Sequence, residues 1–169
     1  MMHPLFLIGF MGSGKTTVGQ TLSEQYHLSF VDTDAYIENK HGMEVAKIFS
    51  KYGEDTFRMY EHEALQEVLS IHIIATGGGI VERNENIFLM QQKGTIIYLQ
   101  TSFSEIDERL KGDVSRPLWI NSDLAMKREL FNRRHQLYEQ CAQMIIQTDR
   151  RTVTDIATEI MHKLSLNAP

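Results

Sequence analysis

The sequence predicts an α/β protein of three layers (α/β/α), in which helices cover both faces of a five-stranded parallel sheet. One observation is that short apolar runs alternate with segments of helical periodicity along the chain. The other is that residues able to bind phosphate, metal or a hydroxyl follow directly after these runs, where parallel sheets bind their ligands. The predicted strands are Leu5–Ile8, Ser29–Val31, Ile71–Ala75, Thr95–Leu99 and Met144–Ile146.

The segment after the first strand carries the most specific signal. It reads Gly9-Phe10-Met11-Gly12-Ser13-Gly14-Lys15-Thr16 and fits the phosphate-binding loop (P-loop) pattern G-x-x-x-x-G-K-[ST] at every position. Its glycines let successive amide N–H groups turn toward a phosphate, Lys15 supplies charge for the β- and γ-phosphates, and the Thr16 hydroxyl can ligate Mg²⁺. A helix follows, because Val18 and Leu22 share one face, and its N-terminus points at the anion. The segment predicts nucleotide binding; the alternative is a glycine-rich turn that happens to contain Lys and Thr.

Two carboxylates follow the second strand, in Asp32-Thr33-Asp34. Alternation along an extended chain points Asp32 and Asp34 to one face, with Thr33 on the other. One carboxylate then reaches the Mg²⁺ shell while the other meets a substrate hydroxyl, a pairing that suits phosphoryl transfer. The alternative is that Asp34 only forms the N-cap of the next helix.

About 39 residues separate the second and third strands, far more than one crossover helix needs. The predicted helices in this stretch are Ala35–His41, Glu44–Tyr52 and Glu54–Ser70. Gly42 and Gly53 break them apart. We expect residues 33–62 to form an inserted substrate-binding region within a single domain, 1–169.

Two pairs of residues on predicted helices admit both a structural and a functional interpretation. Arg58 and Glu61 share a face three residues apart, which is typical of a surface ion pair. Arg134 and Tyr138 stand four residues apart within a charged run, for which a solvated face is the usual interpretation. Spacing alone leaves both interpretations open.

The third and fourth strands are followed by a glycine triplet and by a capped helix. Gly77-Gly78-Gly79 predicts close approach of a ligand or a backbone with φ > 0, because three glycines in a row cost backbone entropy. A helix over Ser102–Leu110 is predicted to begin at Ser102 as N-cap, with Glu105 completing a capping box.

A polar segment that ends at a proline comes next, and we expect residues 111–122 to form a mobile lid. For Arg116, which lies in this segment, the alternative interpretation is a solvated loop residue without a functional role. Leu118 and Trp119 are expected to pack the lid rather than to stack on a base.

The composition indicates one domain with its own core. Of 169 residues 42% are hydrophobic, enough for a core without disulfides or structural metal. The net charge of −5 argues against a general nucleic-acid binder. The sequence contains no run of about 18 apolar residues, so no membrane span is predicted. Cys141 is the only cysteine, which favours a reducing, cytoplasmic compartment. We expect a monomer, with its Lys and Arg gathered locally where it binds anions.

Taken together, these residues resemble the shikimate kinases, P-loop kinases with the fold of the nucleoside monophosphate kinases. The resemblance runs roughly from Leu5 to Leu164. Its landmarks are Gly9–Thr16, Asp32-Thr33-Asp34, Ala46-x-Ile48-Phe49-x-x-x-Gly53-Glu54-x-x-Phe57-Arg58-x-x-Glu61, Gly77-Gly78-Gly79, Arg116-Pro117-Leu118 and Arg134-x-x-Leu137-Tyr138. The P-loop alone marks many nucleotide-binding proteins, whereas the Phe-Arg-x-x-Glu run combined with the other landmarks is far more specific.

The resemblance implies transfer of the γ-phosphate of ATP, with Mg²⁺, to the 3-hydroxyl of shikimate, giving shikimate 3-phosphate and ADP. This reaction belongs to the biosynthesis of chorismate and the aromatic amino acids. The implied partners are ATP and shikimate, with no nucleic acid and no membrane. Two alternatives stay open: another small-molecule kinase of this fold, such as a gluconate or nucleotide kinase, and a regulator without a metabolic substrate.

The resemblance also implies roles for individual residues. The implied catalytic residues are Lys15, Asp34 and Arg116. The implied nucleotide-binding residues are Gly12, Ser13, Gly14, Lys15, Thr16, Thr17, Arg109, Arg116 and Arg151, with Arg150 as the alternative to Arg151. The implied shikimate-binding residues are Asp34, Phe49, Phe57, Arg58, Gly78, Gly79 and Arg134. The implied metal-binding residues are Thr16, directly, and Asp32, through a water.

Overall fold

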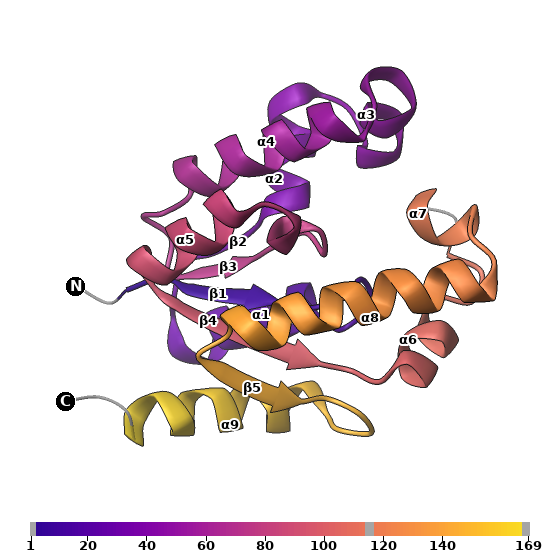
Figure 1. Cartoon of the computed structure of the whole chain (residues 1–169). Helices are drawn as coiled ribbons and strands as arrows, with labels where there is room; N and C mark the ends of the chain where they lie inside the picture. The colour runs from indigo at the N-terminus through magenta and orange to yellow at the C-terminus, as the bar shows by residue number, and fades with distance from the viewer. Residues whose placement is uncertain (1–2, 114–116, 167–169) are drawn as a thin grey trace.

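The computed structural model describes residues 3–113 and 117–166. At its centre is a parallel sheet with the strand order β2-β3-β1-β4-β5 (Figure 1). The strands are β1 (Leu5–Ile8), β2 (Phe30–Asp32), β3 (Ile73–Ala75), β4 (Thr95–Gln100) and β5 (Met144–Gln147). The predicted five-stranded parallel sheet is confirmed, although β2 lies one residue later than predicted and β3 begins later.

Helices follow the strands in the expected alternation. They are α1 (Lys15–Tyr26), α2 (Thr33–His41), α3 (Val45–Tyr52), α4 (Glu54–Glu67), α5 (Asn84–Lys93), α6 (Phe103–Arg109), α7 (Pro117–Ile120), α8 (Leu124–Cys141) and α9 (Val153–Leu166), with the 3₁₀ turn η1 (Ile80–Glu82) before α5. Within the described part of the chain, no helix has the length and apolar character needed to cross a membrane.

Strand β1 is buried on both faces and shows why the fold has three layers. Leu5 and Leu7 pack into a core with residues of α1 and α9, whereas Phe6 and Ile8 pack into a second core with residues of α5 and α8. Successive side chains of a strand point to opposite faces, so one run of four apolar residues serves both cores. Figure 1 shows α8 (orange) and α9 (yellow) on different sides of the sheet. The predicted three-layer α/β/α fold is confirmed.

Helices α2, α3 and α4 occupy the long stretch between β2 and β3 and lie at the top of Figure 1. They enclose a small core of their own, formed by Ile37, Ile48, Phe57 and Ala64. This core fixes α3 and α4 against each other, and residues of both helices line the cavity described below.

Helix α6 begins as predicted, but its cap is only half of a capping box. The Ser102 hydroxyl accepts a hydrogen bond from the Glu105 N–H at 3.3 Å, so Ser102 is the N-cap. The Ser102 N–H donates to Asp149 instead of to Glu105, at 2.9 Å. A neighbouring loop therefore provides the acceptor that the sequence pattern assigned to the helix itself.

Trp119 in α7 packs as expected for the segment after residue 116. Its side chain is 2% exposed, and its ring lies 5.6 Å from Phe10 and 6.0 Å from Phe103 between centroids. The aromatic contacts attach α7 to the P-loop and to α6. The prediction that Trp119 packs rather than stacks on a base is consistent with this position.

Candidate active site

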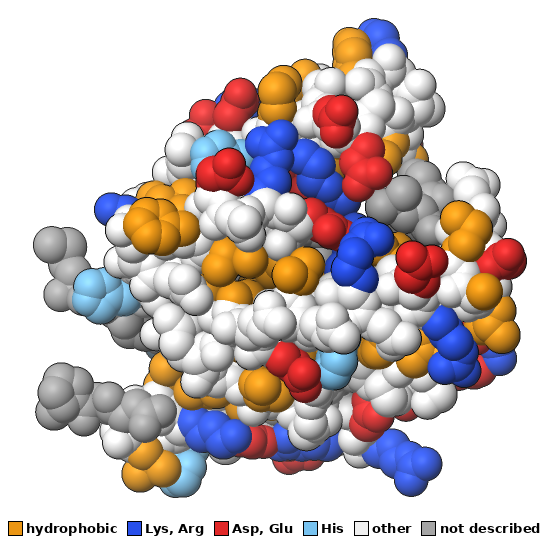
Figure 2. All heavy atoms as spheres, viewed as in Figure 1, with side chains coloured by type: hydrophobic (Ala, Val, Ile, Leu, Met, Phe, Trp, Pro, Cys, Tyr) orange, Lys and Arg blue, Asp and Glu red, His pale blue; other side chains and the backbone are white. Residues whose placement is uncertain are grey.

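A cavity of about 1160 Å³ opens at the carboxyl ends of β1, β2 and β3. Figure 2 shows basic and acidic side chains (blue and red) gathered on the face between α4 and α8. Every sequence-predicted site residue that the structure describes lines the cavity: Gly12, Ser13, Gly14, Lys15, Thr16, Thr17, Asp32, Asp34, Phe49, Phe57, Arg58, Gly78, Gly79, Arg109, Arg134 and Arg151. The predicted Arg116 lies outside the described residues.

The P-loop bends at positions that require glycine. Gly12 and Gly14 have φ angles of 79° and 93°, which residues with a side chain rarely adopt. Gly14 is also the N-cap of α1, so the positive end of this helix opens into the cavity. The buried Lys15 ammonium donates to the Gly9 and Phe10 carbonyls at 2.9 Å each. Backbone N–H groups, helix terminus and ammonium together form an anion-binding loop.

Thr16 and Asp32 bring α1 and β2 together beside the P-loop. The Thr16 hydroxyl donates to Asp32 Oδ2 at 2.5 Å. A hydroxyl and a carboxylate oxygen are ligands of the kind that Mg²⁺ takes, and Mg²⁺ commonly uses one or two protein groups plus substrate phosphates. The two side chains therefore fit a magnesium ion held mostly by nucleotide and water.

Asp32, and not Asp34, is the N-cap of α2, which corrects two predictions. Asp32 Oδ1 accepts from the backbone N–H groups of Asp34 and Ala35 at 2.9 and 3.1 Å. Helix α2 begins at Thr33, so Asp34 lies in the first helical turn and not on an extended chain. The strand alternation argued for these residues was wrong, because the cap turns the chain into a helix directly after Asp32. Both carboxylates nevertheless line the cavity.

The glycine triplet after β3 is required by close approach and not by positive φ. None of Gly77, Gly78 and Gly79 has a φ in the left-handed region. A Cβ on Gly79 would overlap the Arg58 guanidinium, and a Cβ on Gly77 would overlap the carboxylates of Glu61 and Asp34. Of the two explanations predicted for the triplet, positive φ is wrong, and close approach of a ligand stays a prediction, since the groups that approach here are side chains of the protein itself.

Arg58 and Glu61 form a buried ion pair, so the surface interpretation was wrong. Arg58 Nη1 donates to Glu61 Oε2, and Arg58 Nη2 donates to Glu54 Oε1 at 2.9 Å. The Glu61 side chain is fully buried, whereas that of Glu54 is half exposed. Burial raises the pKa of Glu61 from its usual value, although the neighbouring Arg58 works in the opposite direction. The glycine triplet gives this pair the space it occupies.

Arg134 is also buried, and the solvated-face interpretation of its charged run was wrong. Its side chain is 2% exposed and its Nε donates to Glu82 Oε1 at 2.8 Å. One turn further along α8, the buried Tyr138 hydroxyl donates to the Gly78 carbonyl. Helix α8 thus reaches the glycine triplet through two side chains. The sequence analysis named Tyr138 only as a landmark and found no signal for Glu82.

Phe49 and Phe57 form the apolar wall of the cavity beside Arg58. Their ring centroids lie 4.8 Å apart with the planes tilted by 42°. Phe57 belongs to the core of the α2–α4 region and is 3% exposed, while Phe49 packs against that core. This end of the cavity therefore combines apolar rings with cationic groups.

The other end of the cavity lies between α6 and the loop after β5. Arg109 donates to the Gly12 carbonyl at 3.1 Å, and Arg151 donates to the Gln147 carbonyl at 2.9 Å and to Glu159. Of Arg150 and Arg151, the two alternatives for nucleotide binding, it is Arg151 that lines the cavity. The lining residues that the sequence analysis did not assign to the site include, at this end, Thr148, Val153 and Ile156. Thr148 directly follows β5, so the rule that ligands bind after strands would have found it.

Comparisons with known proteins agree with this arrangement. The family model described as "Shikimate kinase" matches residues 11–165. The shikimate kinase of Bacillus cereus (strain G9842) is 40% identical over 167 residues, which are 98% of this chain and 100% of that protein. A solved shikimate kinase from Acinetobacter baumannii, in complex with shikimate, has a TM-score of 0.93 and 34% identity over 99% of this chain and 95% of its own. One from Aquifex aeolicus has a TM-score of 0.84 and 30% identity, with 97% of both chains covered. The chain belongs to the shikimate kinase family and is a small-molecule kinase.

Proposed function

We propose that the two ends of the cavity divide the substrates of a shikimate kinase between them. ATP occupies the P-loop end, with its adenine between Arg109 and Arg151, and shikimate occupies the end formed by α3, α4 and the glycine triplet. One observation carries the proposal: two buried arginines, Arg58 and Arg134, face the same glycine triplet in the cavity that contains the P-loop. A small acceptor with one carboxylate suits two guanidinium groups, whose planar forks can pair with both carboxylate oxygens.

The phosphoryl transfer itself follows from positioning and charge. Asp34 orients the acceptor hydroxyl, or accepts its proton, as the hydroxyl oxygen attacks the γ-phosphorus in line with the leaving ADP oxygen. Lys15 stabilises the charge that develops on the transferred group. Thr16 and Asp32 would hold Mg²⁺, which when bound would neutralise charge on the phosphates. The apolar rings of Phe49 and Phe57 lie against the ring of the acceptor.

Three further expectations do not follow from the cavity. Arg116, outside the described residues, is proposed to meet the transferring phosphoryl group from the lid, residues 111–122. The cytoplasmic location and the monomeric state stay predictions. None of the three is needed for the assignment of the two cavity ends.

The proposal is tested by measuring ADP release from ATP and Mg²⁺ with three acceptors in parallel. Shikimate offers a carboxylate and ring hydroxyls, gluconate a carboxylate on an open chain, and a nucleoside monophosphate a phosphorylated acceptor. We expect turnover with shikimate, and product analysis should give shikimate 3-phosphate. Turnover with another acceptor and none with shikimate would leave the P-loop chemistry in place and contradict the acceptor assignment.

A further inference from the structure

Arg134 is held in the structure by a hydrogen bond from Nε and not from its terminal nitrogens, Nη1 and Nη2. Among the described residues, its one hydrogen bond as donor runs from Nε to Glu82 Oε1, at 2.8 Å. The carboxylates that face it are Glu82 from η1 and Glu61 from α4. Burial raises the pKa of Glu61 overall, and the charge of Arg134 works in the opposite direction. The guanidinium carbon lies 5.9 Å from the centre of the Phe10 ring. One hydrogen-bonded anchor therefore fixes a buried cation within a partly apolar site.

Glu82 is placed to keep its charge and its position. Its Oε1 accepts from Arg133 Nη2 at 3.0 Å as well as from Arg134 Nε. Its side chain is only 22% exposed, and burial opposes ionisation, but the hydrogen bonds from the two arginines lower its pKa below the usual value. Glu82 ends η1, whose backbone starts at the glycine triplet. The Glu82 carboxylate that holds Arg134 thus belongs to the turn that directly follows the glycine triplet, which Arg134 faces.

The hydrogen bond to Nε determines where the two terminal nitrogens point. A guanidinium presents five N–H groups in one rigid plane, so fixing Nε orients the whole fork. Arg134 Nη1 lies 3.5 Å from the position that a Cβ on Gly78 would take, which places the tip beside the acceptor loop. Arg58 differs, because both of its terminal nitrogens are bound to carboxylates of its own helix. Of the two arginines, Arg134 is therefore the one whose terminal nitrogens donate to no carboxylate within the described residues.

We propose that Glu82 is a positioning residue for the acceptor: it holds Arg134 through Nε so that both terminal nitrogens meet the shikimate carboxylate. The inference rests on the proposed role of Arg134 in carboxylate binding. Glu82 touches neither substrate and acts only through Arg134. Its removal lets the guanidinium turn in its site, which weakens the binding of the acceptor and leaves the nucleotide end unaffected.

The test compares Glu82→Ala and Glu82→Gln with wild type by steady-state kinetics in both substrates. We expect Glu82→Ala to raise KM for shikimate about tenfold, with kcat and KM for ATP within about twofold. Glu82→Gln keeps an oxygen that can accept from Nε, so it should lie between Glu82→Ala and wild type. Glu85→Gln, an exposed glutamate at the start of α5, is the matched control for the lost charge and should leave all constants unchanged. Urea unfolding of each variant reports any loss of stability, and Glu82→Gln carries the test if Glu82→Ala does not fold.

Arg134→Gln and the double variant Glu82→Ala/Arg134→Gln separate the positioning role from the proposed function. We expect Arg134→Gln to raise KM for shikimate, and the double variant to raise it no further, because Glu82 has nothing left to position. An increase with Arg134→Gln but none with either Glu82 variant would overturn the positioning role and leave the proposed function standing. No increase with Arg134→Gln would overturn both. Equal increases in KM for shikimate and for ATP in the Glu82 variants would identify a merely structural role.

Discussion

Lys15 combines a local structural role with a proposed chemical one. The ammonium donates to two carbonyls of its own loop, those of Gly9 and Phe10, and lies in the cavity wall. Those two carbonyls are neutral acceptors that water can also satisfy at the surface of an open cavity, so the bonds add only about 1 kcal/mol each to stability. The charge that Lys15 brings to the phosphates has no such substitute.

Lys15→Ala is therefore expected to abolish turnover without unfolding the protein. We expect kcat to fall by about 10²–10³-fold or more, as for loss of one preorganised charge-stabilising donor. The midpoint of thermal unfolding should fall by only a few degrees. ADP release and circular dichroism melting measure the two effects. Lys93→Ala, which removes an exposed lysine in the last turn of α5, is the matched control and should retain full activity. Near-normal kcat for Lys15→Ala would contradict the assignment of the loop.

The residues that the sequence could predict are those whose local pattern already determines their environment. The P-loop is such a case, because its glycines, lysine and threonine depend on one another within eight consecutive positions. Arg58 and Arg134 are the opposite case, since spacing gave a surface ion pair and a solvated face, and both are buried. Only the resemblance to a family placed them in the site. Burial of a charge is decided by partners distant in sequence, and Glu82, 52 residues away from Arg134, left no local signal.

At the scale of elements, the junction between β2 and α2 combines a helix cap with a proposed metal-binding position. Asp32 is the last residue of β2, its Oδ1 caps α2, and its Oδ2 accepts from Thr16 of α1. The sequence analysis expected both acidic residues in the site and considered a helix cap only at Asp34, as the alternative to a functional role, whereas the cap is Asp32. The difference arises because β2 extends one residue further than its apolar run, and the first polar residue after that run becomes the cap.

Substitutions at Asp32 should separate the cap from the metal position. Asp32→Asn keeps an oxygen for the Asp34 and Ala35 N–H groups, whereas Asp32→Ala removes it. We expect Asp32→Ala to lose about 1 kcal/mol of stability, or up to about 2, and Asp32→Asn considerably less. Both variants should need more Mg²⁺ for half-maximal turnover, because each lacks the carboxylate charge. Urea unfolding and a Mg²⁺ titration of activity measure the two effects. An unchanged Mg²⁺ requirement in both variants would limit Asp32 to the cap.

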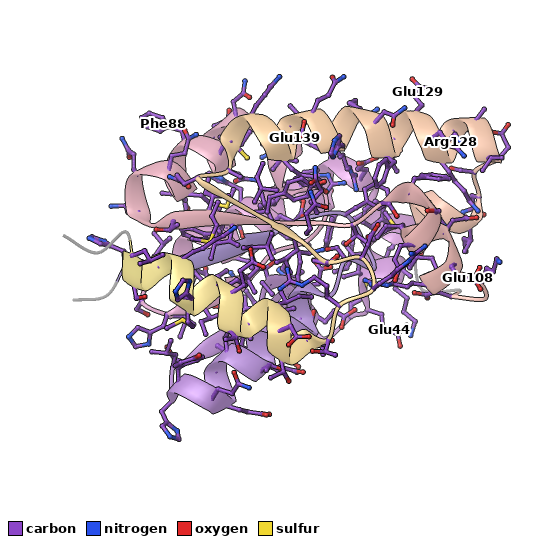
Figure 3. All side chains as sticks on the ribbon, turned by 90° about the horizontal axis from the view of Figure 1, so that it is seen from below. Glu44, Phe88, Glu108, Arg128, Glu129 and Glu139 are labelled. Atoms are coloured by element: carbon purple, nitrogen blue, oxygen red, sulfur yellow. The ribbon has the colours of Figure 1, made fainter. Side chains whose placement is uncertain are left out.

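At the scale of the whole molecule, the strand order brings the predicted site residues together at the carboxyl ends of the strands. Strand β1 lies between β3 and β4, so the P-loop after β1 and the glycine triplet after β3 meet directly. Seen from below in Figure 3, α8 and α9 lie on opposite sides of the strands. The carboxyl ends of the strands are therefore left to the loops. Net charge is −5, yet the cavity gathers Lys15, Arg58 and Arg134. These cations line the cavity in which the two anionic substrates are proposed to meet.

Because the proposed function gives each substrate its own end of the cavity, each end should respond separately to ligand and to mutation. A ligand at a hundred times its Kd stabilises the folded state by about 2.7 kcal/mol, roughly 5–10 °C for a chain of this size. We expect Mg²⁺-ADP and shikimate each to raise the melting temperature of the wild type by that order. Lys15→Ala should lose most of the nucleotide shift and keep the shikimate shift. Arg58→Lys keeps a cation beside the buried Glu61 but lacks the planar fork, so it should lose the shikimate shift and keep the nucleotide shift. Loss of both shifts in either variant would mean that the two ends form one inseparable site, and the division of the cavity between ATP and shikimate would then be wrong.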